Sequence, residues 1–149
     1  MTPFTAAALG TVVLAGISDH QTGKIPNWCS LTSLMVAIAA QAAVYGAGGF
    51  TNAVLGVALV GGIPALLFWT SRARAIGGGD VKILSALGAW LGATRGLEAE
   101  FLGLCLVLMA LGVRTVRDRR GLRAPLKLGA PLAMGTALRL TLESWSWWA

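Results

Sequence analysis

The sequence predicts an all-α membrane protein, a bundle of about six transmembrane helices forming one domain over residues 1–149. Hydrophobic residues make up 56% of the chain and charged residues 12%, and the mean hydropathy is +0.72, values that are unusual for a soluble domain. Residues 28–71 contain no Asp, Glu, Lys or Arg, which leaves room for two crossings of about 20 residues each. The net charge of +6 comes from basic residues gathered in short segments. We therefore interpret it as a topology signal and not as a nucleic-acid surface.

Turn-forming residues separate the predicted spans. No positive charge precedes the apolar residues 4–17, so we expect a retained helix and not a cleaved signal peptide. Glycines at positions 46, 48 and 49 separate the second span from the third, and Pro64 is expected to kink the third. In chain order, the predicted spans are residues 3–19, 28–45, 51–70, 81–95, 101–116 and 128–143.

Lysine and arginine predict the orientation of these spans. Because cytoplasmic loops are enriched in basic residues, the basic segments mark the cytoplasmic side, and both termini are then outside. Trp28 and Trp69 suit the cytoplasmic interface, and the basic run of residues 114–127 is expected to contact anionic lipid. Ten of the twelve basic residues follow the first, third and fifth spans: Lys24, then Arg72, Arg74 and Lys82, then Arg114, Arg117, Arg119, Arg120, Arg123 and Lys127.

Two aspartates, Asp19 and Asp80, lie at the predicted cytoplasmic edge of apolar segments. A carboxylate at the edge of hydrocarbon is costly and is a candidate functional group. Taken singly, Asp80 could be the N-cap of the fourth span, and Asp19 could pair with Lys24. If the two carboxylates meet, they share one proton. The ionised acid can then activate a water while the protonated acid polarises a peptide carbonyl, which is the chemistry of aspartic peptidases.

Few other residues offer chemistry. Three glycines ahead of Asp80 are expected to form a loop that lets an extended peptide approach. His20 is the one histidine of the chain, and we expect a solvated neighbour of Asp19. Cys29 and Cys105 form no CxxC pair and are expected to be small apolar residues. No metal site and no cofactor are expected, since no ligand cluster, Walker loop or dinucleotide fingerprint occurs.

Two segments resemble the motifs of the type IV prepilin peptidases, a family of GxGD aspartic membrane peptidases. Residues 19–27 read DHQTGKIPN, with an aspartate followed by a basic residue and Ile-Pro-Asn, and residues 75–82 read AIGGGDVK, with Gly-x-Gly-Asp and a following lysine. Residues 130–135 resemble the start of the family's last helix more loosely. The resemblance implies that Asp19 and Asp80 are catalytic. It also implies a site shaped by Gly77, Gly78, Gly79, Lys24, Pro26, Asn27 and Lys82.

The resemblance further implies a biological role. Such peptidases cleave the leader of prepilins or pseudopilins after a glycine, at the cytoplasmic face of the bacterial inner membrane. Two-domain members also methylate the new N-terminus and carry an extra cytoplasmic segment near the first helices. Here only about eight residues separate Asp19 from the second span, so methylation is not expected. The chain resembles the compact form associated with Flp-type, tight-adherence pili, and an archaeal preflagellin-type peptidase is a related possibility.

Two alternatives remain open on the residues alone. A small proton-coupled transporter would use Asp19 and Asp80 as relay carboxylates. It would need polar groups deeper in the bilayer, where the second and third spans offer Gln41 and Asn52. A non-enzymatic pilus-assembly protein would use the same aspartates only as a helix cap and a surface charge.

Overall fold

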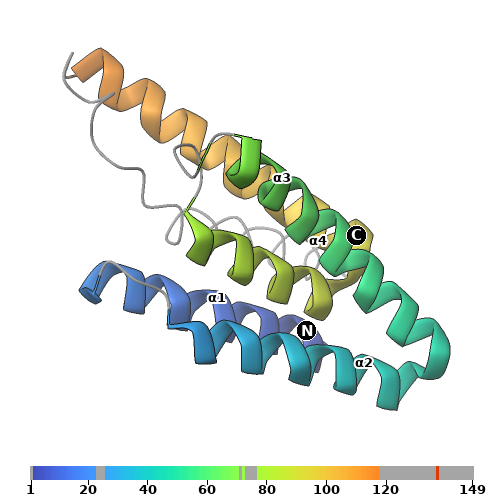
Figure 1. Ribbon diagram of the computed structural model, residues 1–149. Coiled ribbons are helices and arrows are strands. Elements are labelled where there is room, and N and C mark those ends of the chain that lie inside the picture. Colours follow the sequence, from blue (N-terminus) through green and yellow to red (C-terminus); the bar gives the residue numbers. More distant parts are fainter. Residues whose placement is uncertain (1, 23–25, 71, 73–76, 118–136, 138–149) are drawn as a thin grey trace, which may run out of the picture.

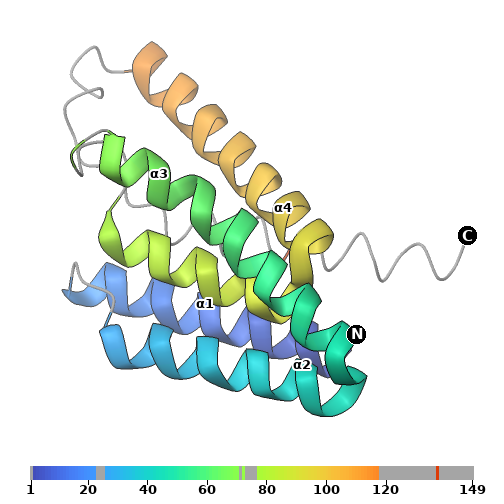
Figure 2. The ribbon, with the colours of Figure 1, turned by 45° about the vertical axis from the view of Figure 1, so that its right-hand side comes forward.

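The computed structural model describes residues 2–22, 26–70, 72, 77–117 and 137, and nearly all of these residues are helical, with no strand among them. The helices lie side by side along their lengths (Figures 1 and 2), which confirms the predicted all-α class. The predicted sixth span lies outside the described residues except for Ala137, as do residues 118–127 of the basic run. The elements are α1 (Pro3–Thr22), α2 (Asn27–Gly56), the π-helical turn η1 (Val57–Gly61), α3 (Gly62–Thr70) and α4 (Gly78–Arg117).

The chain reverses within α2 and again within α4, each time at a glycine. Gly46 has φ 64° and ψ −145°, and Gly92 has φ 77° and ψ −178°, values of φ that glycine adopts readily and other residues avoid. Both reversals lie at the same end of the bundle (Figures 1 and 2). Gly46 falls at the predicted turn. The predicted end of the fourth span at Arg95 is wrong, because the break comes at Gly92 and the helix then continues through residues 96–100.

Pro64 is accommodated by a change in helix type. Proline lacks an N–H and its ring collides with the carbonyl four residues earlier. The backbone from Val57 to Gly61 is π-helical, and such a turn relieves this conflict by widening the helix just ahead of the proline. The irregularity that the sequence predicts in the third span is therefore present as a π-turn.

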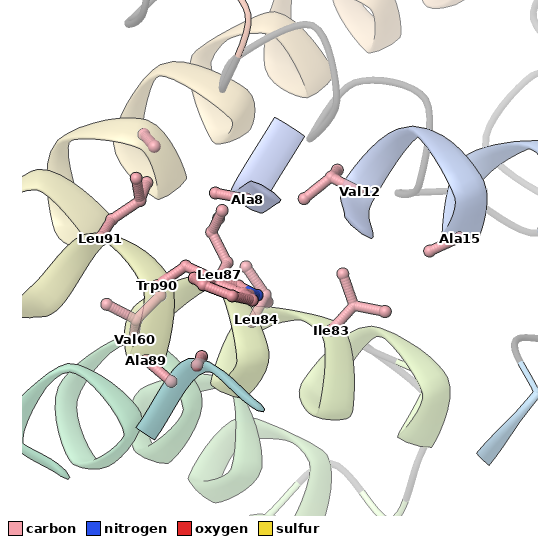
Figure 3. Packing of buried hydrophobic residues seen from close by; sticks show 12 residues of the cluster. Ala8, Val12, Ala15, Val60, Ile83, Leu84, Leu87, Ala89, Trp90 and Leu91 are labelled. Atoms are coloured by element: carbon pink, nitrogen blue, oxygen red, sulfur yellow. The ribbon is translucent and has the colours of Figure 1, made fainter. Parts of the chain in front are cut away.

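The core lies where α4 packs on α1 and α2. Ala8, Val12 and Ala15 on α1 face Leu87, Leu84 and Ile83 on α4, and all six are almost fully buried (Figure 3). On the other side of α4, Gly88 meets Gly56 backbone to backbone, since a Cβ atom added to either glycine would collide with the carbonyl of the other. Small residues allow such close helix contacts, and dispersion between the two backbones then stabilises the contact between Gly56 and Gly88.

The outer surface of the bundle is apolar. One helical stretch of the described residues, Asn27–Thr70, is long and apolar enough to cross a membrane, with mean hydropathy 2.0, and Pro3–Asp19 is a shorter apolar helix. Only 28% of the most apolar window of Asn27–Thr70 is buried inside the protein, whereas the core helix of a soluble protein would be mostly buried. Large side chains face outward on several helices, among them Leu14, Met35, Leu66, Trp69 and Phe101.

Candidate active site

The packing of α1 on α4 brings Asp19 and Asp80 to the same end of the bundle. Asp19 follows Ala15 by four residues and so extends the buried stripe of α1 by one turn. Asp80 precedes Leu84 by four residues and extends the buried stripe of α4 in the same way. α1 and the part of α4 before Gly92 run in opposite directions (Figures 1 and 2). The mutual packing of the two stripes therefore carries both carboxylates to the end opposite the glycine reversals.

The local structure around Asp80 differs from the prediction. Of the three glycines before Asp80, only Gly77 precedes the helix, because α4 begins at Gly78 and includes Gly79. The expected three-glycine loop is therefore wrong for Gly78 and Gly79, which form the first helical turn. The alternative that Asp80 is the N-cap does not hold, since it is the third residue of α4.

Asp80 nevertheless caps its own helix from inside. The Gly77 N–H donates a hydrogen bond to the Asp80 Oδ2 (3.3 Å), while the Gly77 carbonyl accepts from the backbone N–H groups of Asp80 (3.1 Å) and Val81 (3.3 Å). This is the acidic half of a capping box, in which an acid at the third helical position reaches back to the N–H at the cap. A Cβ atom on residue 77 would lie 3.1 Å from that Oδ2. Glycine at 77 therefore lets the carboxylate lie close against the backbone.

The electrostatic environment favours a protonated Asp80. Burial raises the pKa of the Asp80 carboxyl above its ordinary value, the Gly77 hydrogen bond opposes this, and the nearby charge of Asp19 raises the pKa further. The net shift is upward. Asp19 is itself half-buried. The charge of Asp19 therefore reaches Asp80 and opposes its ionisation.

The starts of α2 and α4 are tied together beside Asp80. Lys82 Nζ donates a hydrogen bond to Asn27 Oδ1 at 2.7 Å. Pro26 has an extended backbone, and its carbonyl accepts the first two hydrogen bonds of α2, from Cys29 and Ser30. The motif residues Pro26, Asn27 and Lys82 therefore lie at one end of the bundle with Asp80. Lys24 and the side chain of His20 lie outside the described residues.

A cavity of about 270 Å³ opens between α2 and α4 next to this link. Two of its residues are Asn27 and Lys82, and the others were not singled out from the sequence. Helical spacing could have found two of them, because Ser30 and Ser85 follow Asn27 and Lys82 by three residues and share their helix faces. The lining consists of Asn27, Ser30, Leu31, Leu34, Lys82 and Ser85.

Gln41 of the second predicted span and Asn52 of the third lie at the end of the bundle away from the aspartates. Gln41 Nε2 donates a hydrogen bond of 2.9 Å to the carbonyl of Trp90, and Asn52 Oδ1 accepts a long one of 3.5 Å from the N–H of Ala93. A helix break leaves nearby carbonyls and N–H groups without their usual partners. These two amides therefore cap the break at Gly92, and this structural role accounts for both of the deep polar groups that a transporter would need.

The site defines a class: a helical membrane protein with paired carboxylates at one end. Residues 6–113 match the family model of the type IV leader peptidase family, and the chain belongs to that family. It is 35% identical over 132 residues to the prepilin leader peptidase/N-methyltransferase of Burkholderia pseudomallei strain 1026b, and equally to that of strain K96243. These matches cover 82% of this chain and 40% of either relative, so the chain spans less than half of their length. No solved structure matches the chain significantly.

Proposed function

We propose that this protein is a membrane-embedded aspartic endopeptidase that removes the leader peptide of type IV prepilins or pseudopilins after a glycine. The observation that carries the proposal is the convergence of Asp19 and Asp80 at one end of the two packed stripes of α1 and α4, where burial and, to a smaller extent, the charge of Asp19 raise the pKa of Asp80. Family membership supports the reaction class. The curated relatives are named for leader peptidase activity, which supports the choice of substrate.

The reaction follows from the two protonation states. One aspartate of the pair holds the shared proton and donates it toward the oxygen of the scissile carbonyl, while the other takes a proton from a water molecule. The water oxygen attacks the carbonyl carbon and forms a tetrahedral intermediate. The aspartate that took the proton from water then gives it to the amide nitrogen, the C–N bond breaks, and the first aspartate recovers its proton as the carboxylic acid product forms. No metal and no covalent enzyme intermediate takes part.

The substrate is positioned by the end of the bundle around Asp80. The apolar segment of the prepilin lies against the exposed apolar side chains of the helices, and its leader remains in the cytoplasm. The scissile bond then reaches the depth of the aspartates. The cavity between Asn27 and Lys82 receives a substrate side chain next to the cut. Gly77, Gly78 and Gly79 offer no side chain that would obstruct the peptide, and Pro26 lies at the same end of the bundle.

We further propose a multi-pass arrangement in the bacterial inner membrane with the aspartates on the cytoplasmic side and both termini outside. The side chains of Trp28 and Trp69 are 73% and 83% exposed, and both are at the aspartate end of the bundle, where an interfacial aromatic belt would lie. The basic run from Arg114 to Lys127 supports the same orientation and contact with anionic lipid.

The test is cleavage of a candidate prepilin by the purified protein in detergent, with the new N-terminus read by mass spectrometry. We expect one new N-terminus, directly after a glycine. Asp19→Asn and Asp80→Asn, made separately, should each lower the rate by about 10³-fold, since general acid–base groups contribute on the order of 10²–10⁴. Glu98→Gln on α4 is the matched control and should cleave normally. Normal cleavage by either aspartate variant would remove that residue from the mechanism.

A further inference from the structure

A chain of hydrogen bonds crosses the middle of the bundle and joins α4, α2 and α1. The indole Nε1–H of Trp90 donates to Ser33 Oγ at 2.9 Å, and Ser33 Oγ lies 2.8 Å from Thr11 Oγ1. Thr11 Oγ1 in turn donates to the carbonyl of Ala7 at 2.9 Å. Because the Ala7 carbonyl can only accept, we assign the single hydroxyl proton of Thr11 to that last bond, and Ser33 then donates to Thr11. Each hydroxyl then accepts once and donates once, and the chain has one direction.

Trp90 makes two more contacts that hold it in place. Its carbonyl accepts from Gln41 on α2, and its ring lies 6.2 Å from the ring of Phe4 on α1, tilted by 52°. Its side chain is only 8% exposed. One residue of α4 is therefore fixed to both other helices through its indole, its ring and its backbone. Hydrogen bonds in such a chain polarise one another, and breaking one link leaves the neighbouring group without its partner in an apolar setting.

The hydrogen-bond chain lies to one side of the aspartate pair, toward the glycine reversals, and joins the two helices that carry the aspartates. Thr11 precedes Asp19 on α1 by eight residues, or about 12 Å of helix, and Trp90 follows Asp80 on α4 by ten residues, or about 15 Å. The same two helices pack through Ala8, Val12 and Ala15 of α1, small side chains of which two are alanines. Such a face allows sliding and rotation more readily than an interlocked one. The hydrogen bonds that join Trp90, Ser33 and Thr11, called the junction below, fix the register of α1 against α4, which the apolar contact alone does not fix.

We infer that Thr11, Ser33 and Trp90 are positioning residues for the aspartate pair, fixing α1 against α4 so that Asp19 and Asp80 meet at a set separation. This inference rests on the proposed peptidase function for its kinetic consequence and on the hydrogen-bond geometry for its structural one. Rates of reactions between positioned groups respond steeply to sub-ångström displacement. The hydroxyl of Ser33 is then important to catalysis although it lies far from the reacting atoms.

The kinetic test uses Ser33→Ala, Trp90→Phe, the double variant and the conservative Ser33→Thr. We expect each single variant to lower kcat by about tenfold with KM changed less than about twofold, since positioning acts on the reaction step. The kcat of the double variant should be no lower than that of either single variant, because the two residues act as one unit. Ser33→Thr should restore most of kcat. The alkaline limb of the pH–rate profile should move to lower pH in Ser33→Ala, as greater separation from Asp19 lets Asp80 ionise more easily.

A matched control separates positioning from simple stability. Within the described part of the chain, the Thr51 hydroxyl bonds only to carbonyls of its own helix. Thr51→Val therefore removes a hydroxyl without touching the junction and should leave kcat and the pH profile unchanged. If Ser33→Ala lowers the melting temperature but leaves kcat and the pH profile as in the wild type, the junction only stabilises the bundle and the inference is overturned.

A structural readout keeps the inference testable if no prepilin is cleaved. Spin labels at positions 21 and 81, introduced in a Cys29→Ser and Cys105→Ser background, report the separation between the end of α1 and the start of α4. We expect Ser33→Ala to broaden or shift the distance distribution, Ser33→Thr to restore it, and Thr51→Val to leave it unchanged. An unchanged distribution in Ser33→Ala would refute the inference. Loss of cleavage in the unmodified protein would instead refute the proposed function.

Discussion

The two ends of the bundle differ in how their polar groups are paired. The glycine end is the end with the reversals at Gly46 and Gly92, and the aspartate end is the end with Asp19 and Asp80. At the glycine end, the break at Gly92 is capped by Gln41 and Asn52, so the backbone groups released by the reversal find partners inside the protein. At the aspartate end, Asp80 is half-buried beside a like charge, with its pKa raised. Buried polar groups that are fully hydrogen-bonded stabilise a fold. A half-buried ionisable group with a shifted pKa instead costs stability and is typical of a functional site.

A cavity is present at each end, and the difference between the two supports the same division. The cavity of about 390 Å³ at the glycine end lies among side chains that already cap or pack, including Phe4, Gln41, Asn52 and Trp90. The smaller cavity at the aspartate end adjoins Lys82 and Asn27, whose link joins the two motif segments. This difference supports the proposal that a substrate side chain enters the smaller cavity. The following predictions test the division between a structural end and a reactive end.

The largest effect on stability is expected at Gly92. A Cβ atom at this position would collide with the Asn52 side chain, and the positive φ disfavours any other residue. Gly92→Val should lower the free energy of unfolding by about 2–4 kcal/mol, the sum of backbone strain and a displaced cap. Unfolding in mixed micelles measures it. Gly62→Ala is the control, because Gly62 has an ordinary helical backbone and open space around it, and it should be near neutral. Equal costs for both would contradict the capped-break interpretation.

A smaller effect is expected from the cap itself. Gln41→Leu leaves the buried carbonyl of Trp90 without its donor, which should cost about 1–3 kcal/mol of stability. The rate of prepilin cleavage by the folded fraction should stay within about twofold of the wild type, because Gln41 lies at the end away from the aspartates. Cleavage kinetics and unfolding, measured on the same preparation, separate the two. A large loss of cleavage at unchanged stability would instead support the relay role that a transporter would give this residue.

The sequence could predict the reactive end better than the structural end. The aspartates, the glycines before Asp80 and the Pro26-Asn27 turn are encoded locally, and a carboxylate beside hydrocarbon is conspicuous in an apolar chain. The stripes that unite Asp19 with Asp80 were also readable, since the intervals 15–19 and 80–84 are one helical turn each. The break at Gly92 was not, because its position depends on Asn52 and Gln41 reaching it from another part of the chain, a contact that only the three-dimensional packing decides.

The same reasoning explains why the glycine loop was predicted wrongly. Three glycines have low helix propensity, so a loop was the natural expectation. In the folded protein Gly78 and Gly79 are helical because Asp80 reaches back to Gly77 and caps the first turn. Packing near Phe68 at the end of α3 adds to this, since a Cβ atom on Gly78 would lie 3.6 Å from that ring. A tertiary contact and one capping bond outweigh local propensity.

At the reactive end, Lys82→Met is expected to reduce cleavage moderately. It removes the hydrogen bond to Asn27 and one charge from the rim of the cavity, so kcat/KM should fall by about tenfold, equivalent to about 1.4 kcal/mol of transition-state stabilisation. Arg95→Gln, at the rim of the other cavity, is the matched loss of charge and should change cleavage little. If Arg95→Gln lowers kcat/KM as much as Lys82→Met does, the cavity beside Lys82 has no special role in substrate binding.

The smallest expected effect concerns stability as a function of pH at Asp80. The pKa of Asp80 in the folded protein is raised above its unfolded value of 3.8, so folding binds a proton in the interval between the two values and stability falls as pH rises through it. Asp80→Asn removes this penalty. The variant should match the wild type below about pH 4 and exceed it near neutral pH by less than about 1 kcal/mol, because the carboxylate keeps some solvent and one hydrogen bond.

Thermal unfolding of Asp80→Asn and the wild type at matched pH values measures the difference. An inactive variant that is more stable than the wild type at neutral pH, with the gain vanishing in acid, is the signature of a residue held for reaction at the expense of the fold. A variant that is less stable at every pH would mean that the bond from Gly77 to the carboxylate outweighs desolvation, and that Asp80 is first of all a helix cap.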